Sequence, residues 1–166
     1  HDGQYRCLVT NTHGSAASHP ATLAVMVPPT ITAHPVGAAI ATGKPILLSI
    51  TATGPGTLTY QWQKDGVNLA NPDAFILVQA MPKYNRPTRK WLRDNSGNWC
   101  YLTPNGNLYR KGRLAGNVGA NNWLNPATLL GKGYLHLPYP QPGFYRCRVS
   151  NPAGTATSNA ANLTAP

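Results

Sequence analysis

Two stretches decide the fold: YRCLVTNTHGSAASHPATLAV at residues 5–25 and YRCRVSNPAGTATSNAANLTA at residues 145–165. They align without gaps, and Tyr, Arg, Cys, Val, Asn, Gly, Ala, Ser, Ala and Leu recur at equivalent places. Each copy reads as a strand, a tight turn around Asn-x-x-Gly and a second strand, which predicts a β-hairpin. Because an internal repeat marks a repeated structural unit, we expect the end of one unit followed by a complete second one.

Composition favours an all-β protein that folds without a membrane span. The 166 residues include 16 Gly and 16 Pro, which suit short strands joined by many turns. No stretch approaches the roughly 18 apolar residues needed to cross a bilayer. His1 falls inside the repeat pattern and no signal segment precedes it, so we expect an export signal upstream.

The repeated hairpin resembles the F–G hairpin of immunoglobulin-like domains. Tyr145-Arg146-Cys147 after Pro142-Gly143 is similar to their tyrosine corner, and Tyr60-Gln61-Trp62-Gln63-Lys64-Asp65-Gly66 is similar to their C strand with its buried Trp. Together, the Trp62 strand and the hairpin that begins at Tyr145 resemble the I-set-like repeats of very large bacterial surface proteins. The resemblance implies an immunoglobulin-like β-sandwich, outside the cell or on its surface.

One departure from the family concerns the disulfide. The strand-B cysteine of such domains would fall at Ile50, which cannot bridge Cys147. The resemblance therefore implies a core of Trp62, Tyr145, Cys147 and Ile50 that is held by apolar packing, with Cys147 as a free thiol.

The chain divides into three parts. Val27-Pro28-Pro29 cannot continue a strand ladder and reads as a stiff linker. We expect residues 1–27 to be the F–G hairpin of a preceding domain, either truncated or donated to a neighbouring molecule, and residues 28–166 to be an immunoglobulin-like domain. Residues 71–132 are too many for a loop, so we expect an inserted, mostly β subdomain with one short helix.

Local patterns support structure within the insertion. Residues 75–78 read as an apolar strand, and residues 99–110 read as a hairpin that turns at Asn105-Gly106. The run from Asn125 to Gly131 has helix punctuation, with an Asn N-cap followed by Pro. The segment also resembles, more weakly, a recurring aromatic segment of bacterial surface proteins.

The insertion concentrates positive charge. The chain has 14 Lys and Arg against four acids, a net charge of +10, and nine of these cations lie within residues 71–132. Cations interleaved with rings suit an acidic polysaccharide, a neutral glycan or another polyanion, including single-stranded nucleic acid. The expected ligand-binding residues are Tyr84, Arg86, Arg89, Lys90, Arg110, Lys111, Arg113 and Trp123. Two alternatives stand beside this: the charge only keeps the surface soluble, and Trp91 and Trp99 form the subdomain's own core.

The sequence shows no enzyme pattern, and we expect no catalytic residue, cofactor or metal site. Four acids without any Glu are few for paired carboxylates, and the five His lack metal-ligand spacing. A Cys100–His136 nucleophile is formally conceivable, but Cys100 is more simply a core residue.

Three functions remain. The first is a structural, adhesive module in a surface or filament protein, contacting neighbouring immunoglobulin-like domains or self-associating by strand donation. The second is a carbohydrate- or polyanion-binding module, and the third is an accessory domain of a large secreted hydrolase.

Overall fold

Two β-sheets pack face to face and form the body of the protein. The computed structural model describes residues 1–70 and 73–166. One sheet of the body contains, in spatial order, β5 (Thr30–Ala33), β7 (Ile46–Thr53), β15 (Gly133–Leu137) and β10 (Ala74–Ala80). The other contains β6 (Ala38–Ala39), β18 (Ala161–Thr164), β16 (Gly143–Asn151), β8 (Thr59–Lys64) and β9 (Val67–Asn68), and β17 (Gly154–Thr157) pairs with β16.

This is the A-B-E-D and A′-G-F-C-C′ strand order of an immunoglobulin-like sandwich. The antiparallel pairing of β16 with β8 sets Cys147 directly beside Trp62, and both side chains have 0% exposure. Tyr145 (2%) and Ile50 (1%) lie in the same core cluster, which closes the space between the two layers. The fold class expected from the sequence is confirmed.

The tyrosine corner has its usual geometry. The hydroxyl of Tyr145 donates to the carbonyl of Gln141 at 2.9 Å, so the buried ring keeps its one polar atom satisfied. Cys147 is a free thiol. Its backbone N–H donates to Ser158 Oγ at 2.9 Å, which ties strand β16 to the chain that leaves β17.

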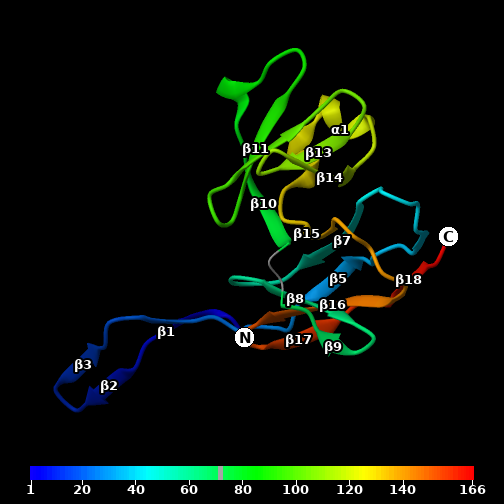
Figure 1. The fold of residues 1–166 in the computed structure, drawn as a ribbon. Helices are drawn as coiled ribbons and strands as arrows, with labels where there is room; N and C mark the ends of the chain where they lie inside the picture. The colour runs from blue at the N-terminus through cyan, green and yellow to red at the C-terminus, as the bar shows by residue number, and fades with distance from the viewer. Residues whose placement is uncertain (71–72) are drawn as a thin grey trace.

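The insertion continues the first sheet beyond the sandwich (Figure 1). Residues 74–76 of β10 pair with β15, and residues 77–80 pair with β11 (Lys90–Asp94), with a β-bulge between Leu77 and Gln79 that redirects the strand. The order then runs to β12 (Trp99–Leu102), β13 (Asn107–Arg110) and β14 (Arg113–Asn117). Asn71, the expected first residue of the insertion, lies outside the described residues.

A second apolar cluster fills the space beneath these strands. Its buried members are Phe75, Leu77, Leu92, Cys100, Leu102, Leu108, Leu129 and Tyr134. Three short helical turns complete this part: η1 (Pro82–Tyr84), α1 (Asn121–Leu124) and η2 (Pro126–Leu129). The helix expected from Asn125 to Gly131 is only the 3-10 turn η2. The Asn125 side chain makes no capping bond, and Leu130 is already extended, so the helix ends after a single turn.

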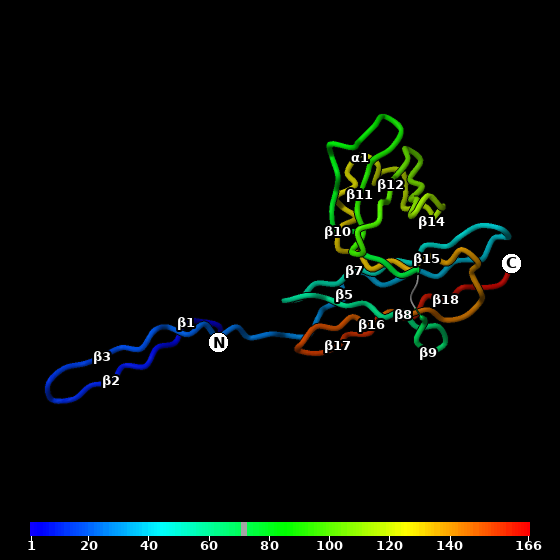
Figure 2. Tube along the Cα trace, turned by 60° about the vertical axis from the view of Figure 1, so that its left-hand side comes forward, coloured from blue at the N-terminus to red at the C-terminus, as the bar shows by residue number. Residues whose placement is uncertain are grey.

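Residues 1–27 project from the sandwich as a separate ribbon (Figure 2). β1 (Gly3–Tyr5) pairs with β4 (Ala21–Leu23), and β2 (Leu8–Asn11) pairs with β3 (Gly14–Ala17). Large apolar side chains along this ribbon are open to solvent, including Tyr5 (51%), Val9 (65%) and Leu23 (50%). The hairpin forms, but no part of the chain that the structure describes covers its apolar face.

Candidate functional site

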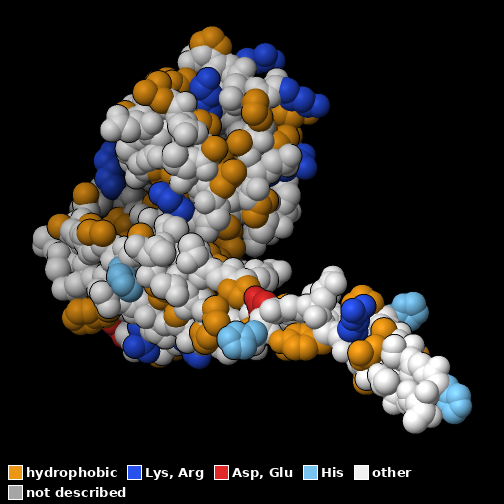
Figure 3. Space-filling model, turned by 180° about the vertical axis from the view of Figure 1, so that it is seen from behind, with side chains coloured by type: hydrophobic (Ala, Val, Ile, Leu, Met, Phe, Trp, Pro, Cys, Tyr) orange, Lys and Arg blue, Asp and Glu red, His pale blue; other side chains and the backbone are white. Residues whose placement is uncertain are grey.

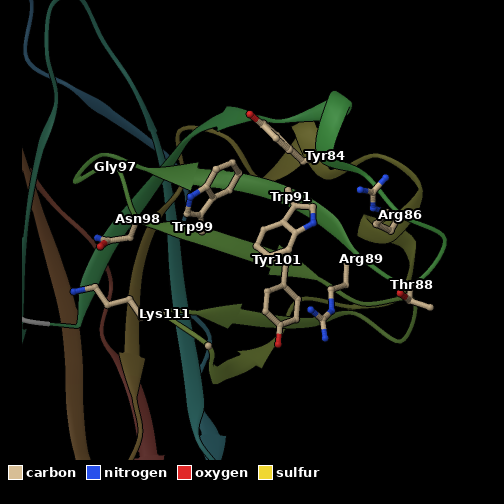
Figure 4. Close-up of a pocket in the computed structure, with 11 residues that line it drawn as sticks. Tyr84, Arg86, Thr88, Arg89, Trp91, Gly97, Asn98, Trp99, Tyr101 and Lys111 are labelled. Atoms are coloured by element: carbon tan, nitrogen blue, oxygen red, sulfur yellow. The ribbon is translucent and has the colours of Figure 1, made fainter.

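A broad concavity lies on the outer face of the inserted sheet (Figure 4). It has a volume of about 890 Å³ and runs from the loop before β11 to the turn between β13 and β14. We call it the aromatic groove. Its lining residues are Tyr84, Arg86, Thr88, Arg89, Trp91, Gly97, Asn98, Trp99, Tyr101, Lys111 and Gly112.

Strand alternation builds the floor of the groove. Successive side chains of a strand point to opposite faces, and β11 and β12 pair so that Trp91 lies opposite Tyr101. The core face receives Leu92, Cys100 and Leu102, which are fully buried. The bulky rings are therefore left on the outer face.

The rings touch one another in a continuous row. Ring centroids are 5.0 Å apart for Tyr84 and Trp99, 5.5 Å for Trp99 and Trp91, and 5.2 Å for Trp91 and Tyr101. Tyr109 extends the row by stacking on Tyr101 at 4.7 Å and 10°. Such contacts stabilise each pair by about 0.5–1.5 kcal/mol beyond area burial, so the row is rigid before any ligand arrives.

Cations lie on the faces of these rings. The guanidinium carbon of Arg89 is 4.7 Å from the centroid of Tyr101, and that of Arg93 is 4.7 Å from the centroid of Trp99. Lys83 Nζ lies 5.0 Å from the centroid of Tyr84. A ring held against a guanidinium fixes the position of that cation but leaves its positive charge available.

The groove has no carboxylate among its lining residues. Within residues 1–70 and 73–166, ion pairs join only Lys64 to Asp65, Arg110 to Asp94 and His136 to Asp73. Arg86, Arg89 and Lys111 therefore face solvent without an acidic neighbour in this part of the chain. Figure 3 shows Lys and Arg side chains gathered over the inserted part, with no acidic side chain among them on that face.

A buried ion pair supports the groove from beneath. Asp94 is 1% exposed and accepts a hydrogen bond from Arg110 Nε at 3.0 Å. It also accepts bonds from the backbone N–H groups of Ser96 and Asn98, which fixes the turn that carries Gly97 to the groove. Burial alone would raise the pKa of Asp94, but the bonds from Asn98 and Arg110 outweigh it and lower the pKa.

The loop before β11 is folded back in a defined conformation. Asn85 Oδ1 accepts the N–H of Trp91 at 2.9 Å, and Arg86 and Arg89 exchange backbone hydrogen bonds of 2.7 and 3.2 Å. The two arginines therefore leave the same tight turn and reach the same end of the groove (Figure 4).

The structure divides the eight expected ligand-binding residues. Tyr84, Arg86, Arg89 and Lys111 line the groove, whereas Arg113 does not. The remaining three, Lys90, Trp123 and Arg110, also lie outside the lining.

Lys90 and Trp123 contact one another. Lys90 Nζ lies 5.2 Å from the centroid of Trp123, and the Trp123 ring packs partly buried against the second core cluster. Their contacts are thus structural and lie away from the lining of the groove.

Arg110 must be corrected as a candidate ligand contact. It is 7% exposed, pairs with Asp94 and lies 4.5 Å from the ring centroid of Phe75, on the core side of the sheet. It follows Leu108 by two residues, so the alternation that buries Leu108 buries Arg110 as well.

The sequence missed Trp91 and Trp99 as groove residues. A place in the subdomain's core was the alternative given for them, yet both line the groove, and Trp99 is 37% exposed. The signal that could have found them is the second alternating series, Leu92 with Cys100 and Leu102, because those compact side chains fill the core face. Thr88, Gly97, Asn98, Tyr101 and Gly112 were also not singled out.

Nothing in the described residues forms a nucleophilic or metal centre. Burial raises the pKa of the Cys100 thiol to about 12, which leaves it protonated and unreactive at neutral pH. No group of three His, Cys, Asp or Glu side chains among the described residues is placed to hold a metal ion. No described helix is long and apolar enough to cross a membrane.

Known structures resemble the whole chain in fold. Three consecutive immunoglobulin domains from the I-band of titin, I67–I69, superpose over 99% of this chain and 41% of theirs, with a TM-score of 0.58 and 15% identity. Extracellular domains 3–5 of Drosophila OTK superpose over 100% of this chain, with a TM-score of 0.51 and 19% identity. The chain has an immunoglobulin-like fold.

Sequence comparison gives the same class of relative. Mouse hemicentin-1 is 32% identical over 105 residues, 63% of this chain, and human leucine-rich repeats and immunoglobulin-like domains protein 1 is 42% identical over 66 residues, 40% of this chain. The chain spans 2% and 6% of those proteins. No protein-family model matches. These relatives are animal proteins, so they do not support the bacterial source expected from the sequence.

Proposed function

We propose that this chain is a non-catalytic, extracellular structural module from a tandem series of immunoglobulin-like domains. In this proposal residues 1–27 close a preceding domain, residues 28–166 form the next, and residues 71–132 are an inserted platform for adhesion. The observation that carries it is a hydrogen-bond pattern that occurs twice, 140 residues apart.

The pattern begins with the two tyrosine corners. Tyr5 donates to the His1 carbonyl at 3.0 Å, as Tyr145 donates to Gln141 at 2.9 Å. The strand pairing is repeated too, since β1 and β4 have the register of β16 and β18. Both copies are therefore built as the F–G hairpin of a sandwich.

A hydrogen bond from a cysteine backbone N–H to a serine hydroxyl is also repeated. The backbone N–H of Cys7 donates to Ser18 Oγ at 2.9 Å, and that of Cys147 donates to Ser158 Oγ at the same distance. The copies differ in exposure: Val9 is 65% exposed and Val149 0%. The first copy thus presents the same apolar face, without the sheets that cover the second copy.

The linker between the two units is held in place. Asn151 Nδ2 donates to the carbonyl of Val27 at 2.8 Å and to that of Pro55 at 3.0 Å. Asn11 occupies the equivalent position in the first hairpin. A turn Asn that bonds the incoming linker favours a joint of fixed direction, which suits a structural array.

The relatives favour this context. The superposed titin fragment consists of three immunoglobulin domains in one chain, and the OTK fragment consists of extracellular domains. The partner of the first hairpin, on this proposal, is the A-to-E portion of a preceding domain. Donation of the hairpin to a second copy of the chain is the rival, and the experiment separates the two.

The test is a tandem chain in which residues 28–140 are placed directly before residue 1. The 140-residue offset makes this splice continuous, because Gln141 and His1 are equivalent. The readout is the reaction of Cys7, exposed in the present structure, with a thiol reagent in native buffer. We expect Cys7 to react rapidly in the 166-residue chain, which stays monomeric, and to be protected in the tandem chain.

The matched controls are Val9→Asp and Val149→Asp. Val9→Asp should abolish protection of Cys7 in the tandem chain yet leave the unfolding of the 166-residue chain unchanged, whereas Val149→Asp should destabilise both. A Cys7 that stays reactive in the tandem chain contradicts the proposal. A dimer of the 166-residue chain with Cys7 already protected supports strand donation in its place.

A further inference from the structure

We propose that the aromatic groove of the insertion binds an acidic polysaccharide, whose carboxylate or sulfate groups pair with Arg86, Arg89 and Lys111. The observations that support this are independent of the tandem arrangement. They are the charge of the groove, the state of its ring faces and the rigidity of its frame.

The charge of the groove favours an anionic ligand. Three cations line the groove and Arg93 lies beside it, on the ring of Trp99. No lining residue is acidic, and the nearby Asp94 is buried against Arg110. A cationic ligand would be repelled by these side chains, and an anion meets cations that no carboxylate of the described chain neutralises.

The cations are spaced for a chain with repeated charges. Arg86 and Arg89 lie at one end of the groove, and Lys111 lies at the other end beside Asn98 (Figure 4). A ligand with one acidic group would satisfy only one end. A polymer with acidic groups on successive units can satisfy both ends while it crosses the rings.

The rings favour a sugar over a nucleic acid base. Binding of single strands uses flat bases stacked on open ring faces. Here Tyr101 has Tyr109 stacked on it at 4.7 Å and Arg89 over its ring at 4.7 Å, and Arg93 covers Trp99. A base that stacked on the Arg89 side of Tyr101 would have to displace that guanidinium. A sugar can pair its acidic group with that guanidinium and pack its apolar C–H groups against the exposed part of Trp99, which is 37% exposed.

The groove is prepared before binding. The Arg86–Arg89 turn is closed by its own backbone hydrogen bonds, and Lys111 occupies a left-handed conformation (φ 51°) in a two-residue turn with Gly112. The rings support one another by edge contacts. Because these side chains are already ordered, they lose little conformational entropy on binding, and few contacts are enough for measurable affinity.

The probe for the test is heparin, a sulfated polysaccharide, with polygalacturonate, neutral dextran and oligo(dT) measured beside it. The readout is intrinsic tryptophan fluorescence of the 166-residue chain at several salt concentrations, since Trp91 and Trp99 lie in the groove and Trp62 is buried. We expect heparin and polygalacturonate to change the fluorescence and dextran to leave it unchanged. Binding should weaken steeply with salt because several cations engage together.

The variant is Arg86→Ala with Arg89→Ala, and its matched control is Lys44→Ala with Arg148→Ala, an equal charge change at exposed sites on the sandwich. We expect the groove variant to lose affinity about tenfold or more and the control to change it less than about twofold. Near-ultraviolet circular dichroism checks that both variants stay folded. Equal losses in variant and control, absence of heparin binding, or tighter binding of oligo(dT) than of heparin would each overturn the proposal.

Discussion

Trp62 and Cys147 lie side by side on neighbouring strands, and neither side chain has any exposed surface. They meet where an immunoglobulin-like domain of the usual kind has a disulfide, and here Ile50 replaces the second cysteine. Apolar packing alone must hold the two sheets together at this point.

Removing the indole should therefore be costly. Trp62→Ala leaves a cavity at the centre of the core, and we expect it to lower the free energy of unfolding by about 3–5 kcal/mol. The measurement is urea unfolding followed by circular dichroism. Trp99→Ala, at a rim position that is 37% exposed, is the control and should cost far less. Similar costs for the two variants would contradict the assignment of Trp62 to the core.

The three thiols should differ sharply in reactivity. Burial raises the pKa of Cys100 and of Cys147 to about 12, whereas Cys7 is exposed. In native buffer at pH 8 we expect one fast-reacting thiol per chain, and three after denaturation. Reducing agent should leave the stability unchanged. Two or more fast thiols in the native chain would show that one of the cores is open.

The buried ion pair predicts a specific weakness of the insertion. Asp94→Asn removes the carboxylate that pairs with the buried Arg110, and breaking a buried pair in this way costs about 3–5 kcal/mol. Asp73→Asn is the control, because Asp73 is 42% exposed and lies 3.7 Å from His136. That change should cost under about 1 kcal/mol. Urea unfolding compares the two, and equal effects would contradict a structural role for Asp94.

The same carboxyl predicts acid sensitivity. Because the pKa of Asp94 is lower in the folded chain than its ordinary 3.8, its contribution to stability is fully present above that value. It is lost as pH falls through the folded pKa. The Asp94→Asn variant should therefore lose less stability than the parent between pH 4 and pH 2, as measured by thermal unfolding. A parallel loss in both proteins would contradict this.

A milder pH effect should come from His136 in β15. Its burial lowers its pKa below the ordinary 6.5, against the opposing pull of Asp73. The unfolded chain then takes up a proton more readily, so stability is complete above pH 6.5 and falls at lower pH, by at most about 1.4 kcal/mol per pH unit. His136→Gln should remove that slope between pH 7 and pH 5.5 in urea unfolding. If the dependence of stability on pH is unchanged in this variant, other titratable groups cause it.

The sandwich could be predicted because its signals are local and repeated. The Tyr-x-Cys strand, its Asn-x-x-Gly turn and the Trp62 strand each carry their own pattern, and the insertion's hairpin at residues 99–110 was visible for the same reason. What the sequence did not show was which face of that hairpin turns inward. Alternation places Trp99 and Tyr101 together, but only the packing of Leu92 and Leu108 beneath them shows that the rings face solvent.

Arg110 illustrates the same limit. As a cation among rings it looked available to a ligand, and its burial depends on Asp94, which is 16 residues away in sequence. The pairing of β11 with β12, and of β12 with β13, brings the two together. No local sequence pattern predicts an ion pair between residues that far apart. The groove was therefore identifiable only in part, through Tyr84, Arg86, Arg89 and Lys111.

One measurement tests most directly whether the same hairpin occurs twice, once within a closed core and once open. It is hydrogen–deuterium exchange of backbone amides in the 166-residue chain. Amides of residues 145–149 should exchange only on global unfolding, orders of magnitude more slowly than their equivalents at residues 5–9, which should exchange close to unprotected rates. Equal protection of the two segments, or rapid exchange at residues 145–149, would contradict the account.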